Sequence, residues 1–109
     1  MDTILWDFFE ERIATLVLLE TYTLSKAIGV TCRRHPSDSA DVLLLAAISF
    51  VTHLDNAAGF VEGTSLLKSH RRYRVIAALA ADVALLSHTN RTCYDLLEFW
   101  RSTRSTVFD

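Results

Sequence analysis

The chain has 109 residues, of which half are hydrophobic and 22% are charged, and its formal net charge is -2. A chain of this length makes a single domain, here residues 1–109, and its balance of apolar and charged residues is that of a globular protein, not a disordered one. The small negative charge excludes a general attraction to nucleic acid or anionic lipid. Two cysteines and a start without a signal-peptide pattern lead us to expect a cytoplasmic protein.

A first long helix is predicted from Asp2 or Thr3 to Ile28, because apolar residues recur there at helical spacing. Asp2 or Thr3 can cap its first turn, and Gly29 is expected to end it. The apolar coverage of this helix is wider than one seam can bury, which predicts an interface with a partner. The side chains assigned to that interface are Trp6, Phe8, Phe9, Leu19 and Tyr22.

The central element is predicted to be a second helix, residues 41–62, because every residue from Val42 to Val51 except Ser49 is apolar. A helix that is apolar almost all round must be covered on most sides. Its thin polar stripe includes Ser49, Thr52, His53 and Asn56, at spacings that share one helix face. The stripe is interpreted either as the strip that faces water or as one wall of a polar groove with His53 as its titratable member.

A third helix and a shorter fourth are expected after Gly63, with apolar seams at Val75–Leu86 and Cys93–Trp100. The polar run at positions 87–92 predicts a break between them, with one long kinked helix as the alternative. The last residues, 102–109, are expected to fray.

Positive charge gathers between Gly63 and Ala81, a stretch with no acidic residue. Lys68, Arg71, Arg72 and Arg74 are interpreted mainly as internal ion-pair partners of acidic residues, or as part of a protein-binding surface. The expected acidic partners are Asp7, Glu10, Glu11, Asp55 and Glu62. Binding of nucleic acid or phosphate through residues 68–74 is the alternative function, although one short basic cluster on a mildly acidic chain is a weak indication of it.

His53 in a small helical domain invites comparison with histidine phosphotransfer domains. That family's motif usually carries a lysine three residues after the histidine, whereas this chain has Asn56. Without that cation a phosphoimidazole would lose charge stabilisation.

A second set of residues that could bind a metal consists of Cys32, His35, His88 and Cys93. The first two lie in the connection after the first predicted helix and the last two in the connection after the third, and an up-down bundle brings these two connections to one end. Four nitrogen and sulfur ligands suit zinc, but their spacing matches no strong metal motif, so we expect no metal and no cofactor. No phosphate loop, carboxylate pair or nucleophile–base motif is present either, and we therefore expect no enzymatic activity.

The sequence as a whole predicts an all-α antiparallel bundle of three long helices and a shorter fourth that associates with itself. The expected function is a protein–protein interaction module (a regulator, adaptor or chaperone-like protein) that binds through apolar helix faces, with a homodimer as the favoured assembly and no membrane association. Arg71, Arg72 and Arg74 are included in the expected partner-binding set.

Overall fold

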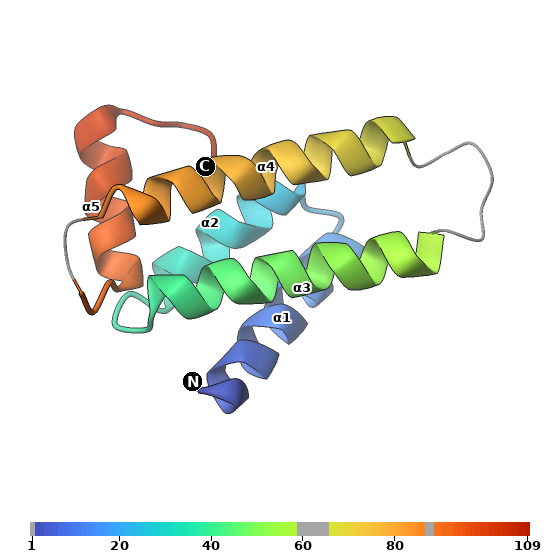
Figure 1. Ribbon diagram of the computed structural model, residues 1–109, viewed down its shortest axis with the longest axis horizontal. Helices are drawn as coiled ribbons and strands as arrows, with labels where there is room; N and C mark the ends of the chain where they lie inside the picture. Colours follow the sequence, from blue (N-terminus) through green and yellow to red (C-terminus); the bar gives the residue numbers. More distant parts are fainter. Residues whose placement is uncertain (1, 59–65, 87–88) are drawn as a thin grey trace.

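The computed structural model describes the backbone of residues 2–58, 66–86 and 89–109, and the side chains of those residues except 57–58 and 66–69. The fold is all-α, as predicted (Figure 1). Its helices are α1 (Thr3–Leu18), α2 (Leu24–Arg34), α3 (Ala40–Ala58), α4 (Leu66–Ala84) and α5 (Cys93–Thr103). In Figure 1, α3 and α4 lie side by side and run in opposite directions, with α5 across their left ends. No helix in these described ranges has the length and hydropathy needed to cross a membrane.

The expected first helix is in fact two helices, so the prediction of a single element from residue 2 to 28 is wrong. The chain leaves α1 after Leu18, and Thr21 takes a left-handed backbone conformation with φ of 57°. The side chain of Thr23 then accepts a hydrogen bond from the amide of Lys26 at 3.3 Å, which caps the start of α2. This turn lets α1 and α2 fold back on each other, and it places Gly29 inside α2 instead of at a helix end.

The second predicted helix, observed as α3, contacts all four other helices, as α2 does, and the most extensive helix contacts are those of α3 with α1 and α4. Leu43, Ala46 and Ala47 are completely buried, and the two alanines let neighbouring backbones approach closely. The inward apolar side chains of the other helices complete one core: Phe9, Ile13 and Leu16 from α1, Ala27, Ile28 and Cys32 from α2, Leu79 and Val83 from α4, and Cys93, Leu96 and Trp100 from α5.

The break predicted between the third and fourth helices is confirmed, with α4 ending at Ala84 and α5 beginning at Cys93. Thr92 caps α5 through a reciprocal capping box with Asp95. The connection before α5 lies beside the connection before α3, since the amide of Cys93 donates to the carbonyl of Asp38 at 2.7 Å. Arg91 reinforces this end of the bundle with two hydrogen bonds to the carboxylate of Asp41, at 2.9 and 3.3 Å.

The last residues are docked on the bundle, so the prediction that they fray is wrong. The Phe108 ring is buried and stacks on Trp100 with their centroids 4.6 Å apart. The backbone carbonyl of Phe108 accepts a hydrogen bond from Nη1 of Arg33 at 3.1 Å. Gly29 makes this approach feasible, because a Cβ atom there would stand 1.7 Å from the Phe108 carbonyl oxygen.

Candidate protein-binding surface on the first helix

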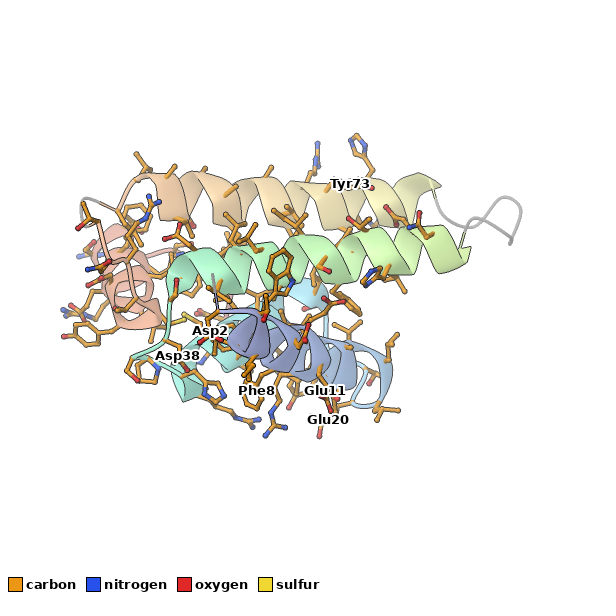
Figure 2. The ribbon with its side chains drawn as sticks, turned by 60° about the horizontal axis from the view of Figure 1, so that its bottom comes forward. Asp2, Phe8, Glu11, Glu20, Asp38 and Tyr73 are labelled. Atoms are coloured by element: carbon orange, nitrogen blue, oxygen red, sulfur yellow. The ribbon has the colours of Figure 1, made fainter. Side chains whose placement is uncertain are left out.

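Four large apolar side chains of α1 and its C-cap are exposed: Ile4, Phe8, Leu18 and Leu19, with exposed fractions of 82%, 39%, 58% and 78%. Their spacing places them on one side of the helix, which we call the outer stripe. The opposite side of α1 packs its Phe9, Ile13 and Leu16 side chains into the core. Figure 2 shows α1 at the front of the molecule, with Phe8 and Glu11 on its outward side.

The middle of the outer stripe is hollowed. Phe8, Glu11, Arg12 and Thr15 line a depression of about 270 Å³. The guanidinium of Arg12 lies 5.7 Å from the centre of the Phe8 ring, and the ring of His35 meets Phe8 edge-on at 5.1 Å. The aromatic side chain is therefore held in place by its neighbours while part of it still faces outward.

The aromatic residues predicted to bind a partner do not all reach the surface. Phe9 is completely buried, so its ring belongs to the core and its assignment to a partner interface is wrong. Trp6 and Tyr22 are half-buried and pack against the core, with the ammonium of Lys26 4.5 Å from the centre of the Tyr22 ring. Leu19 and Phe8 are the members of that set that stay exposed.

The basic cluster of residues 68–74 contains both an internally paired arginine and arginines that are exposed to solvent. Arg72 pairs with Asp55 across α4 and α3 at 2.8 Å, as the internal-pairing interpretation predicts, so it is turned towards the protein and not towards a partner. Arg71 and Arg74 are exposed on α4, beside the exposed His70. The side chain of Lys68 lies outside the described residues.

The polar stripe of α3 lies along an exposed side of the helix. Thr52 and Asn56 are exposed and Ser49 is half-buried. His53 connects α3 to α1, because its Nδ1 lies 2.7 Å from the Glu10 carboxylate. It lines a hollow of about 340 Å³ with α1 residues that include Asp7 and Glu10, and it is the member of the stripe that reaches this hollow.

Cys32 and Cys93 come together, as the up-down arrangement predicts, while the wider metal set does not assemble among the described side chains. Both cysteines are fully buried free thiols, and the Cys32 thiol donates to the Cys93 carbonyl at 3.5 Å. The hydrogen bond with Cys93, together with burial, raises the pKa of Cys32 well above its usual range. His35 packs against Phe8 and Phe9 instead of the thiols, and His88 lies outside the described residues. No group of three potential metal ligands is found within residues 2–56, 70–86 and 89–109.

Comparison of the chain with protein-family models, with curated proteins and with solved structures finds no match. The exposed apolar side of α1 was indicated in the sequence by the width of its apolar coverage. A hollow lined by arginines beside residues 104–109, described below, had no sequence signal, because its members are far apart along the chain.

Proposed function

We propose that this protein is a non-enzymatic protein–protein interaction module that binds a partner through the outer stripe of α1. The observation that carries the proposal is the exposure of Ile4, Phe8, Leu18 and Leu19 on one side of one helix. Burying a large aliphatic or aromatic side chain contributes about 1.5–3 kcal/mol, so covering four of them would drive association. A regulator, adaptor or chaperone-like role follows from that mode of binding.

The proposed partner is a helix that lies along α1, and a second copy of this chain is the first candidate. Contact between single helices is at the small end of protein interfaces, so we expect a dissociation constant on the order of micromolar. Glu11 and Arg12, at the middle of the stripe, would restrict partners to those that place opposite charges there. The proposal places the protein in the cytoplasm, where reducing conditions keep Cys32 and Cys93 as thiols.

The test is the mass of the purified protein in solution, measured by light scattering at tens of micromolar. The wild-type chain, of 12.3 kDa, is expected to form a dimer. Phe8→Glu and Leu19→Glu should each yield a folded monomer, because a carboxylate in the buried interface would be costly to desolvate. Leu85→Glu is the matched control, since Leu85 is 68% exposed but lies beyond the end of α4, and it should leave the dimer intact.

A monomeric wild type would exclude self-association and leave a different protein as the partner. That case is tested with a photo-crosslinking residue in cells, placed at position 19 or, as control, at position 85. A discrete product from position 19 alone would support the α1 surface. Equal products, or none, from the two positions would contradict it.

A further inference from the structure

A third hollow, of about 340 Å³, lies where α2, α5 and residues 104–109 meet. Three arginines line it, and they come from three different parts of the chain: Arg33 from α2, Arg101 from α5 and Arg104 from the turn after α5. A chain with a net charge of -2 thus places three arginine residues in the lining of one hollow. Guanidinium groups match the geometry of phosphate and carboxylate oxygens, and several converging arginines are typical of anion recognition.

Two of the arginines, Arg33 and Arg101, make hydrogen bonds within the protein. Nη1 of Arg33 donates to the carbonyl of Phe108 at 3.1 Å, which fixes this side chain against the docked final residues. Arg101 pairs through Nε and Nη2 with Glu98 one turn earlier on α5. A guanidinium has five N–H donors, so both side chains retain donors beyond these contacts.

Arg104 occupies an unusual backbone position. It caps the end of α5 with φ of 56° and ψ of 34°, the left-handed conformation in which glycine is the favoured residue. An arginine there carries a conformational cost that glycine would avoid. At this position, Arg104 is one of the residues that line the hollow.

The positive charge of the three arginines is offset in part by Glu98, which pairs with Arg101, and by Asp109. Asp109 is the one acidic residue on its wall. The carbonyl oxygens at the end of α5 would oppose an anion, but those of Trp100 and Arg101 accept hydrogen bonds from the amides of Ser105 and Arg104, at 3.0 and 3.3 Å.

The rest of the wall offers hydroxyl groups for a charged group of a ligand and apolar side chains for its organic part. Ser105 and Thr106 add hydroxyl groups, which donate hydrogen bonds to phosphate oxygens. Leu97 and Trp100 supply the apolar part of the wall, and Trp100 is held by a hydrogen bond from its indole Nε1 to Asp82 at 2.9 Å. The hollow is within the size range of small-molecule sites.

We propose that this arginine hollow binds the phosphate monoester of a small organic molecule. The phosphate lies among Arg33, Arg101 and Arg104, and the organic group lies against Leu97 and Trp100. This site is separate from the outer stripe of α1 and does not depend on the proposed partner binding.

The experiment is a titration of ¹⁵N-labelled protein with phenyl phosphate at constant ionic strength, followed through the amide signals of Ser105 and Thr106 and the indole signal of Trp100. Saturable shifts of these signals are expected at ligand concentrations up to about 10 mM. Arg101→Gln should weaken binding about tenfold, the effect expected from removing one charge-assisted contact. Arg104→Gly should do the same, and it suits the left-handed backbone, so a folding defect is not its explanation.

Arg71→Gln, on exposed α4, is the matched control and should bind phenyl phosphate as the wild type does. Phenol should produce no saturable shift, and inorganic phosphate should displace phenyl phosphate. The proposal is overturned if the wild type shows no saturable shift at these signals, if Arg101→Gln and Arg104→Gly bind as tightly as Arg71→Gln, or if phenol binds as well as its phosphate ester.

Discussion

At the scale of single residues, Cys32 and Cys93 show how the fold sets the chemistry of a side chain. Their thiols lie together between α2 and the start of α5, fully shielded from water. Such an environment disfavours a thiolate, so the pKa of Cys32 is raised by its hydrogen bond with Cys93 and by burial. Both residues therefore act as small apolar core side chains while the protein is folded.

We predict that the free energy of unfolding falls as the pH rises above about 8.5, the pKa of an unperturbed cysteine. Above that pH the unfolded chain loses the Cys32 proton while the folded protein keeps it, so stability declines with a limiting slope of about 1.4 kcal/mol per pH unit. The measurement is urea unfolding of wild type and Cys32→Ala between pH 7 and 10. A pH dependence that is the same in both proteins would show that Cys32 is not responsible.

At the scale of elements, the packing of α2 against the final residues depends on one missing side chain. Gly29 sits in the interior of α2, where glycine is a poor helix former, yet the Phe108 carbonyl lies against it. The stacking of Phe108 on Trp100 and the hydrogen bond from Arg33 then anchor the segment. A cost in helix propensity is thus offset by tertiary contact.

We predict that Gly29→Ala lowers the free energy of unfolding by about 2 kcal/mol, because the new Cβ atom meets the Phe108 carbonyl and displaces the segment. The same substitution in a chain shortened to end at Ser105 should instead be neutral or stabilise by up to about 1 kcal/mol, since alanine favours the helix and the obstruction is gone. Urea denaturation of the four proteins measures both effects. An equal loss in the two backgrounds would contradict this account of the docking.

At the scale of the whole molecule, the arrangement of charge decides what the surface can bind. The acidic residues Asp7 and Glu10 line one hollow, whereas the arginines beside residues 104–109 line another. The basic cluster of α4 is divided, with Arg72 paired to Asp55 and Arg71 and Arg74 exposed. Because the cluster is divided and the net charge is -2, we expect little attraction to a nucleic-acid backbone.

We predict that Arg72→Ala lowers the free energy of unfolding by about 1 kcal/mol, because it removes a half-buried, charge-assisted hydrogen bond. Arg71→Ala, its exposed neighbour, should leave stability unchanged within about 0.5 kcal/mol. Neither variant should alter binding to labelled duplex DNA, which we expect to be absent in fluorescence anisotropy at 50 to 200 mM salt. Tight binding that weakens steeply with salt and is reduced by Arg71→Ala would restore the nucleic-acid alternative.

The sequence by itself determined the all-α class and the central helix around Val42–Val51, and it favoured a break before α5 over one long kinked helix. These features rest on local patterns, namely apolar periodicity and an interrupted apolar seam. Such patterns can be read along the chain. The same periodicity hid the turn between α1 and α2, because residues 19–23 contain neither glycine nor proline. It also indicated that α1 has surplus apolar surface.

Only the tertiary structure decided which apolar residues fill the core and which remain exposed, placing Phe9 inside and Leu19 outside. It also decided that Phe108 docks beside Gly29 and that Arg33, Arg101 and Arg104 share a hollow. Gly29 and Phe108 are 79 positions apart, and such a contact depends on the path of every helix between them. The sequence around Gly29 gives no sign of Phe108, nor the reverse, so only the packing of the helices shows that the two residues meet.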